Sequence, residues 1–363
     1  MTDPADDYAR SMLTRSGLDR LPAHLQASYG IEVAGTAELD LGVFRIDRSD
    51  GPPWVARVFP AARRPGAAAG DATVLDFLAG HGFPAERAAA PDPVSVLDRQ
   101  DVLVTGYVEG VPRSGRTEAI RRLGGFVRLG AMLARLETLP GARETITRDG
   151  GAWHHLADGS PGAEIAAAAA LLAAAEGRVA AGHERAAYES LRADVAGFDG
   201  GDDLPEALVH PDFVLANAIP APASDSGSDG AAGSGAAGRA NRAAAGRPAA
   251  ERPAADRLVM VDWTGAGIGP RLWPLAFLLY AAGARGPERV GSVVRGYTRY
   301  ARLEPGELSR LAAVMTVRPS IFEIWAFGAG RKSAAEAAHG VARARELAGS
   351  IAARAVEAFR DAA

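Results

Sequence analysis

Four side chains that can handle protons or metal ions stand in the second half of the chain, three of them close together. His210, Asp212 and Asn217 lie in the segment LVHPDFVLAN, and Asp262 follows the apolar run Leu258–Val261. Phosphoryl transfer needs a carboxylate that orients the attacking hydroxyl and accepts its proton, together with oxygen ligands for magnesium. Asp212 suits the first role. Asn217 and Asp262 suit the second, because magnesium prefers carboxylate and amide oxygens.

Three of these residues also have a simpler interpretation when each is taken alone. His210 then braces its loop through hydrogen bonds, Asp212 is a turn residue after Pro211, and Asp262 caps a strand end. One H-x-D-x-x-x-x-N match is a weak signal, since each of its residues is common. The whole ordered set, with an apolar run ending in Asp-Trp and a glycine-rich turn after it, favours the functional interpretation.

The segments around these residues are expected to bring them together. A tight loop from His210 to Ala216 predicts a return of the chain, so that Asn217 faces Asp212 across one cavity. The continuous apolar run Leu258–Val261 predicts a buried strand. Asp262 stands where that strand ends and a turn with two glycines begins, which allows a sharp exit from the sheet.

With these motifs in view, the chain resembles the aminoglycoside phosphotransferase family, whose relatives include small-molecule kinases. The resemblance runs from about Ile31 to about Ala282. Its segments, in the family's order, are Trp54–Val58, Asp71–Leu78, Val102–Gly110, Leu208–Asn217 and Val261–Trp263. The resemblance implies an α+β, protein-kinase-like fold with two lobes: a small β-rich N-lobe at residues 30–106 that binds nucleotide, and a larger, mainly helical C-lobe at 107–363.

The resemblance also implies ATP as a cofactor and assigns residues to its binding. Arg57 stands where the family has its phosphate-binding lysine, and Asp71 stands where the acidic partner of that lysine is found. Gly106, Tyr107 and Val108 correspond to the hinge between the lobes, whose backbone contacts adenine. On this basis we expect Asp71 to hold Arg57 against the phosphates.

The same resemblance implies Mg²⁺ as the second cofactor and gives the second half of the chain its roles. Asp212 becomes the catalytic base, with His210 in the same motif. Asn217 and Asp262 become the metal ligands. The expected reaction moves the γ-phosphate of ATP to a hydroxyl group of a small molecule.

Three departures from the family pattern leave a second function open. Arginine at position 57 is a planar fork, whereas lysine is a compact point charge, so the exchange is not conservative at a phosphate site. Asp71 is shorter than the usual glutamate, and the segment Thr36–Gly42, at the place of the family's glycine loop, holds one glycine. The amino-acid composition offers another reason for arginine at position 57: Lys332 is the only lysine among the forty basic residues, so arginine replaces lysine almost everywhere in this chain. The alternative is a nucleotide-binding pseudokinase that acts as a regulatory or partner-binding module.

Composition limits the other classes of function. The 363 residues carry a formal net charge of −4 and show no basic block, which argues against a nucleic-acid-binding surface. Cysteine is absent, which excludes disulfides and cysteine zinc sites. The acidic start of the chain is unlike a secretory signal, and its apolar runs are too short to span a membrane. We therefore expect a cytoplasmic protein whose partner is a small hydroxyl acceptor; the sequence leaves its oligomeric state and the identity of the acceptor open.

Periodicity predicts the remaining organisation. Residues 1–29 are expected to form a polar leader with a short helix near its end. The N-lobe elements are expected at Gly42–Ile46, Trp54–Phe59, Val94–Leu97 and Val102–Thr105 as strands, with one helix at Asp71–His81. The C-lobe helices are expected at Thr117–Leu139, Pro161–Gly182, Glu184–Phe198, Pro274–Ala282, Pro287–Tyr300, Pro305–Thr316 and Ala334–Asp361. Residues 220–256 are low in large apolar side chains and predict a disordered insertion.

Overall fold

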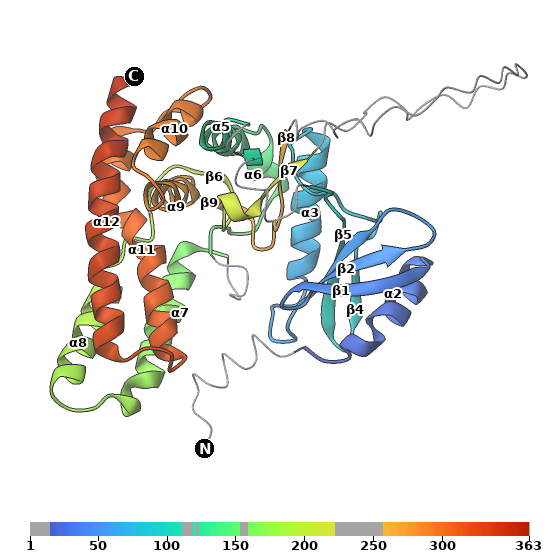
Figure 1. Ribbon diagram of the computed structural model, residues 1–363, viewed down its shortest axis with the longest axis horizontal. Helices are drawn as coiled ribbons and strands as arrows, with labels where there is room; N and C mark the ends of the chain where they lie inside the picture. The colour runs from blue at the N-terminus through green and yellow to red at the C-terminus, as the bar shows by residue number, and fades with distance from the viewer. Residues whose placement is uncertain (1–14, 111–118, 121–122, 153–158, 222–256, 363) are drawn as a thin grey trace, which may run out of the picture.

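A sheet-rich N-lobe and a helical C-lobe lie side by side (Figure 1). The computed structural model describes residues 15–110, 119–120, 123–152, 159–221 and 257–362. The predicted α+β architecture with two lobes is confirmed. Most of the predicted insertion, from residue 222 to 256, lies outside the described residues.

The N-lobe is built on one antiparallel sheet with the strand order β1-β2-β3-β5-β4. Its strands are β1 Val33–Asp40, β2 Val43–Arg48, β3 Trp54–Val58, β4 Val94–Leu97 and β5 Gln100–Gly106. Side chains alternate between the two faces of a strand. In β3 this alternation places Trp54, Ala56 and Val58 in one core, while Arg57 points to the opposite face.

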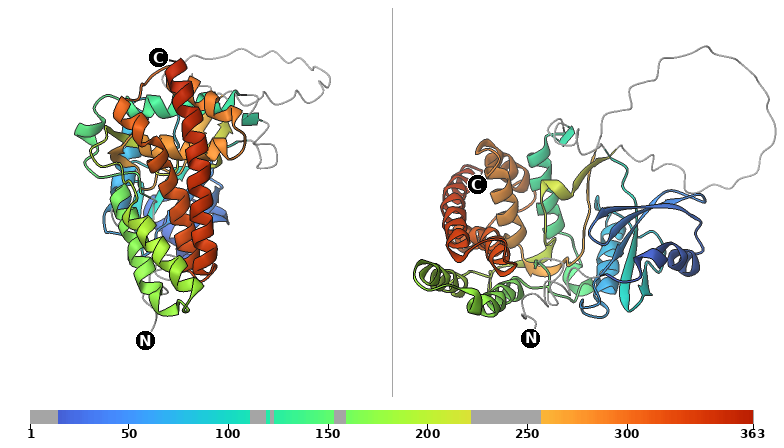
Figure 2. Two further views of the ribbon diagram at one scale, coloured as in Figure 1. Left: turned by 90° about the vertical axis from the view of Figure 1, so that its left-hand side faces the viewer. Right: turned by 60° about the horizontal axis from the view of Figure 1, so that its bottom comes forward.

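Two helices cover the two faces of this sheet. Helix α2, Leu21–Tyr29, follows the short 3-10 turn η1, Leu18–Arg20, and buries Leu21 and Leu25 in the core that contains Trp54. The helix of the predicted leader is therefore part of the N-lobe. Helix α3, Ala67–Gly80, lies on the side of the sheet that faces the C-lobe (Figures 1 and 2).

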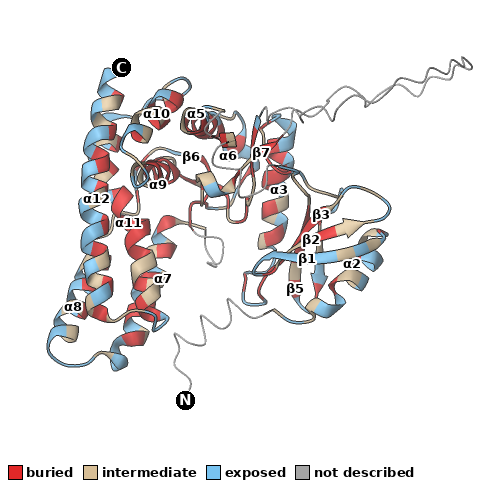
Figure 3. Cartoon of the chain, viewed as in Figure 1, coloured by how far each residue is buried: buried red, intermediate tan, exposed pale blue. Residues whose placement is uncertain are grey.

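Helices make up most of the C-lobe. They are α5 Gly125–Glu137, α6 Ala142–Thr145, α7 Pro161–Ala175, α8 His183–Ala196, α9 Leu272–Gly283, α10 Glu288–Tyr297, α11 Pro305–Gly328 and α12 Ala334–Asp361, with a 3-10 turn η2 at Glu176–Arg178. Helices α9 and α11 are largely buried, whereas much of α12 is exposed (Figure 3). Helix α12 begins at a capping box in which Ser333 and Glu336 each satisfy the other's backbone N–H.

Helix α11 is longer than its sequence pattern predicts, because it continues through Pro319 to Gly328. Among the described helices it is also the one that is long and apolar enough to cross a membrane. Two thirds of its apolar window, 67%, is buried inside the protein, and it contacts α7, α9 and α12. It is therefore the central core helix of the C-lobe.

Two short two-stranded sheets flank the motif residues. Strand β6, Glu206–Val209, pairs with β9, Gly267–Pro270, and β7, Ala218–Ala221, pairs with β8, Arg257–Met260. Pro220 and Ala221, assigned by sequence to the insertion, therefore belong to a strand. Gly267 is required by close packing, because a Cβ atom there would lie 2.5 Å from the carbonyl oxygen of Asp149.

A buried carboxyl group in the C-lobe makes stability depend on pH. Oε2 of Glu137 accepts a hydrogen bond of 2.5 Å from the Tyr297 hydroxyl, while its Oε1 is buried without a partner among the described residues. Burial raises the pKa of Glu137 from 4.5 to about 8, although Tyr297 and Arg271 act to lower it. The folded state therefore holds a proton that the unfolded chain loses above pH 4.5.

This proton predicts a fall in the free energy of unfolding as pH rises between about 4.5 and 8. The stabilisation is complete below the unfolded pKa and is lost as pH passes the folded value. We expect a fall on the order of 1–4 kcal/mol in urea unfolding followed by circular dichroism, and Glu137→Gln should remove most of it. An unchanged pH profile in Glu137→Gln would assign the dependence to another group.

Candidate active site

His210 fixes the loop that carries Asp212. The ring is fully buried, and its Nδ1 accepts a hydrogen bond of 3.0 Å from the backbone N–H of Asp212. An amide N–H can only donate, so the ring proton must sit on Nε2, which donates to the carbonyl oxygen of Val261 at 3.1 Å. Burial lowers the pKa of His210 and so keeps the ring neutral, although the carboxylates of Asp262 and Asp212 oppose this shift.

Because both ring nitrogens of His210 are occupied by backbone groups, neither is available to a reactant. The assignment of His210 as a catalytic residue is therefore corrected to that of a positioning residue. It links the loop of Asp212 to the strand end before Asp262, and its ring packs edge-on against Trp263 at 4.7 Å between centroids. One side chain thus sets the spacing between two of the candidate site carboxylates.

Asn217 returns to Asp212 as its spacing predicts. It ends the 3-10 turn η3, Leu215–Asn217, and its Nδ2 donates to both the backbone oxygen and Oδ2 of Asp212, each at 2.9 Å. The two hydrogen bonds use the amide nitrogen, so the side-chain oxygen of Asn217 is the atom suited to a cation. They also fix the rotamer of Asp212, which is only half-buried.

A buried ion pair in the C-lobe supports the same loop from behind. Arg318 of α11 is 2% exposed, donates to the carbonyl oxygens of Pro211 and Gly151, and pairs with Glu164 of α7 at 2.9 Å. Pro211 immediately precedes Asp212. The sequence does not mark Arg318, because it lies beyond the predicted end of that helix, directly before Pro319, with no motif around it.

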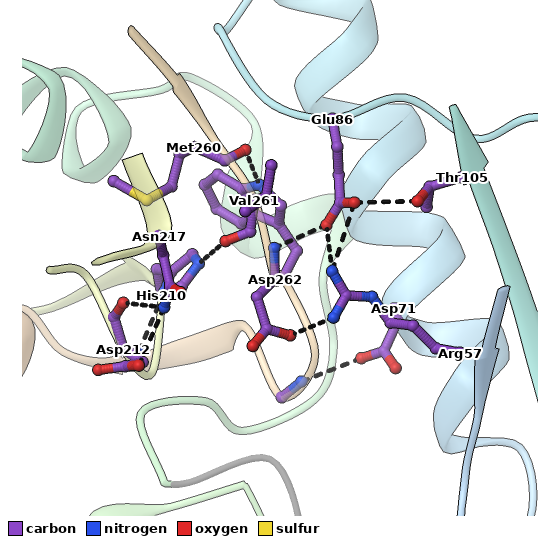
Figure 4. A network of polar contacts seen from close by, with 12 residues as sticks. Arg57, Asp71, Glu86, Thr105, His210, Asp212, Asn217, Met260, Val261 and Asp262 are labelled. Atoms are coloured by element: carbon purple, nitrogen blue, oxygen red, sulfur yellow. Dashed lines mark hydrogen bonds and ion pairs between the residues drawn. The ribbon is translucent and has the colours of Figure 1, made fainter. Parts of the chain in front are cut away.

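Asp262 lies between the lobes in a backbone conformation that is uncommon for a residue with a side chain. Its φ angle is 69°, in the left-handed region that aspartate tolerates better than most residues. Its backbone N–H donates to Oε1 of Glu86 at 2.7 Å, and its Oδ1 accepts from Nη1 of Arg57, also at 2.7 Å (Figure 4). Asp262 is therefore held by two N-lobe residues.

The predicted pairing of Arg57 with Asp71 is wrong. The guanidinium instead contacts Glu86, with Nη2 at 3.1 and 3.4 Å from the two carboxylate oxygens, and Asp262 (Figure 4). Burial lowers the pKa of Arg57, but the carboxylates of Glu86 and Asp262 more than reverse this, so the net shift is upward. Arg57 thus stays charged between its two partners.

Glu86 is the acidic partner that sequence analysis did not find. It is 3% exposed, and besides Arg57 and Asp262 it accepts a hydrogen bond of 2.9 Å from the Thr105 hydroxyl. Its own backbone N–H donates to the carbonyl oxygen of Met260 in β8 at 3.1 Å. Glu86 lies on an irregular segment after α3, where no periodic pattern marks it.

Asp71 has a different position from the one expected. It is fully buried in α3 and pairs with Arg63 at 2.8 Å and with Arg148 at 2.6 Å. Its Oδ1 also accepts from the backbone N–H of Gly265 at 3.1 Å. Asp71 therefore connects α3 to the turn that follows Asp262, and it makes no hydrogen bond with Arg57.

The hinge residues differ in how far the fold already uses their backbone N–H groups. Gly106 donates to the carbonyl of Arg87 at 2.9 Å and Tyr107 to that of Pro53 at 3.0 Å. The N–H of Val108 has no partner among the residues that the structure describes. Val108 is therefore the predicted hinge position whose N–H the described part of the fold does not use.

The turn between β1 and β2 replaces a glycine loop with acidic side chains. The N–H of Leu41 donates to the side chain of Asp40 at 2.7 Å, and that of Gly42 donates to the side chain of Glu38 at 3.3 Å. These two amides are therefore engaged with carboxylates. Neither amide is therefore open to a phosphate in this structure.

Comparison with known proteins places this geometry in a family. Residues 33–221, just over half of the chain, match the model of the phosphotransferase enzyme family. The chain belongs to this family. The predicted family resemblance is thereby confirmed, and the matched residues include Arg57 and the loop from His210 to Asn217. No curated protein matches the chain.

Solved structures show the same fold for the whole phosphotransferase chain. A choline/ethanolamine kinase family protein from Mesorhizobium loti is 17% identical, with a TM-score of 0.54, and the match covers 98% of this chain and 99% of that one. An aminoglycoside phosphotransferase from Alicyclobacillus acidocaldarius is 13% identical, with a TM-score of 0.55 and coverage of 96% and 98%. An amicoumacin kinase in complex with AMP-PNP and Ca²⁺ is also 13% identical, with a TM-score of 0.53 and coverage of 90% and 93%. These likenesses confirm the protein-kinase-like fold.

The phosphotransferase site offers few protein ligands to a metal. These ligands suit magnesium that is also bound by substrate phosphates, and they do not suit a metal that protein side chains hold by themselves. The amide oxygen of Asn217 and the carboxylate of Asp262 are hard oxygen donors. No group of three or more His, Cys, Asp or Glu residues able to hold a metal occurs in the described part of the chain. Magnesium is usually held by one or two protein oxygens together with substrate phosphates and water. The residues present therefore fit a metal that arrives with a nucleotide.

A large cavity of the phosphotransferase lies away from these residues. It has a volume of about 700 Å³ and lies among α9, α11 and α12, with Tyr280, Phe322, Glu323 and Arg343 in its walls. Its lining includes none of the motif residues and mixes acidic with basic side chains. We assign it no role in the chemistry.

Proposed function

We propose that the protein is an ATP-dependent phosphotransferase that moves the γ-phosphate to a hydroxyl group of a small molecule. The observation that carries the proposal is the fixed position of Asp212. His210 and Asn217 hold its backbone and its Oδ2, yet the residue stays half-buried and open to a reactant. A carboxylate held in this way is suited to take the proton of an acceptor hydroxyl.

The other residues would bind and orient the reactants. The N–H of Val108 would donate to adenine, and Arg57 would donate to the phosphates. Asn217 and Asp262 would hold magnesium, which when bound neutralises charge on the phosphates. His210 would keep Asp212 and Asp262 at a fixed separation. Because the backbone N–H groups of Leu41 and Gly42 already donate to carboxylates, side chains would bind most of the phosphate oxygens.

One observation favours the alternative, a nucleotide-binding pseudokinase with a regulatory or partner-binding role. The candidate metal ligand Asp262 is bound to Arg57 in a strong ion pair of 2.7 Å. If no ligand displaces this pair, the site binds nucleotide without completing the metal centre. The two functions therefore differ in whether magnesium strengthens nucleotide binding and whether phosphate is transferred.

The proposal extends to the acceptor class and to location. Small polar hydroxyl compounds such as choline, ethanolamine and aminoglycosides are suitable first acceptors, because similar solved structures bear the names of such kinases. No nucleic acid or membrane partner is proposed, and a cytoplasmic location is part of the proposal. A coupled assay for ADP release, run with each acceptor and with water alone, tests transfer directly.

Asp262→Ala is expected to abolish the stabilisation that magnesium adds to the ATP-bound protein, because the charged metal ligand is removed. The measurement is a thermal-shift titration with ATP, with and without magnesium. Asp203→Ala, on an exposed turn, is the control: Asp203 also has a left-handed backbone, with φ 63°, so alanine carries the same backbone cost there. This control should keep the magnesium-dependent shift of wild type. A magnesium-dependent shift that persists in Asp262→Ala would show that the metal is bound elsewhere. The absence of any ATP-dependent shift in the wild type would overturn the proposed function.

A further inference from the structure

Arg57 lies between two carboxylates that differ in how firmly the fold holds them. Glu86 is 3% exposed and is fixed by Thr105 and by the backbone N–H of Asp262. The side chain of Asp262 is 28% exposed. Figure 4 shows the guanidinium between them, with Nη2 toward Glu86 and Nη1 toward Asp262.

We propose that Arg57 occupies the cation position at Asp262 in the ligand-free protein, so that a divalent metal must displace its guanidinium to bind there. The inference rests on the proposed role of Asp262 as a metal ligand. Nη1 lies 2.7 Å from Oδ1, the distance of a charge-assisted hydrogen bond. A magnesium ion bound to the same carboxylate would meet a positive group at close range, which opposes its binding.

Glu86 is expected to retain the guanidinium of Arg57 when a metal binds to Asp262. It holds Nη2 from a buried position, so the guanidinium keeps one partner after Nη1 leaves Asp262. The phosphates of a nucleotide then offer Nη1 a new acceptor. The guanidinium of arginine can serve two partners at once, because it carries donors on separate nitrogens in a rigid fork. Metal without nucleotide is therefore expected to bind weakly, and metal with nucleotide to bind well.

The test measures Mn²⁺ binding without nucleotide, by the electron paramagnetic resonance signal of the free ion. Arg57→Gln should bind Mn²⁺ at least about tenfold more tightly than wild type, because the competing charge has gone. Arg45→Gln is the matched control. It removes the same charge from the adjacent strand β2, where Arg45 pairs with the exposed Asp47, and should bind Mn²⁺ as wild type does.

A double variant allows the same measurement if Arg57→Gln does not fold. Arg57→Gln leaves Glu86 buried without its cation, which is destabilising. Arg57→Met combined with Glu86→Gln removes both charges, and Thr105 can turn its hydroxyl to accept from the new amide. This protein should also bind Mn²⁺ at least about tenfold more tightly than wild type, and adding Asp262→Asn should abolish the gain.

The outcomes separate this inference from the proposed function. Equal Mn²⁺ affinity in wild type and in whichever Arg57 variant folds would overturn the inference, even where ATP with magnesium still stabilises the wild type. A gain in affinity that survives Asp262→Asn would overturn it as well. Failure of ATP with magnesium to stabilise the wild type concerns the proposed function alone, since the Mn²⁺ comparison is made without nucleotide.

Discussion

Replacing Asp212 with asparagine should lower phosphate transfer by roughly 10²–10⁴-fold while leaving ATP affinity near that of wild type. The asparagine keeps the shape of the side chain, and its oxygen can still accept the hydrogen bond from Nδ2 of Asn217. It cannot take up a proton from the acceptor hydroxyl. The loss should therefore appear in kcat, measured with a saturating acceptor, and not in the melting temperature.

The matched control for this variant is Asp203→Asn, which changes the same type of side chain on an exposed turn. It should leave both kcat and ATP affinity unchanged. If Asp212→Asn keeps full turnover, another group accepts the proton and the catalytic assignment is wrong. If the wild type transfers phosphate to no hydroxyl acceptor and Asp212→Asn changes nothing, the pseudokinase alternative is favoured.

The second large effect is expected at the ion pair between Arg318 and Glu164. Arg318→Met removes the arginine that pairs with Glu164 in the C-lobe core, and with it the donors to Pro211 and Gly151. Breaking a buried pair by removing one partner costs about 3–5 kcal/mol. We expect a loss of this size in urea unfolding, with a further loss of turnover because Pro211 adjoins Asp212.

Helix α11 also supplies a control for that prediction. Arg310 pairs with Asp199 on a more exposed part of the same helix. Arg310→Met should therefore cost less than Arg318→Met, because solvent screens a pair that is partly exposed. Replacing both buried partners, with Arg318→Met and Glu164→Leu, should recover part of the stability lost in the single variant. Equal losses for Arg318→Met and Arg310→Met would contradict the role given to the buried pair.

Sequence alone predicts the elements whose patterns are local and regular. Helix α12 has the predicted bounds, because its apolar residues recur at helical spacing behind the capping residues Ser333 and Glu336. Strand β1 was missed, since most of its residues are exposed and give no alternation. Strand β9 was missed as well, because its glycines resemble a turn until Gly267 is seen to pack against Asp149.

The contacts of the candidate site also fall into those that the sequence predicts and those that it does not. The meeting of Asp212 with Asn217 was predictable, because both lie in one short loop. The partner of Arg57 was not, because two carboxylates from different segments compete for it and only the packing of the lobes decides between them. Asp71 faces the turn at Gly265 and two other arginines, whereas Glu86 lies beside β8. A linear pattern contains no information about that choice.

The attachment of Asp71 bears on how this protein can be controlled. In protein kinases, movement of the equivalent helix sets whether the lysine and the metal-binding aspartate are in place. Here α3 is joined through Asp71 to Arg148 and to the backbone of Gly265, directly beyond Asp262. An outward swing of α3 would therefore have to break the buried ion pair and this hydrogen bond. Control by an outward swing of the helix is disfavoured, so activity should follow the supply of nucleotide, metal and acceptor.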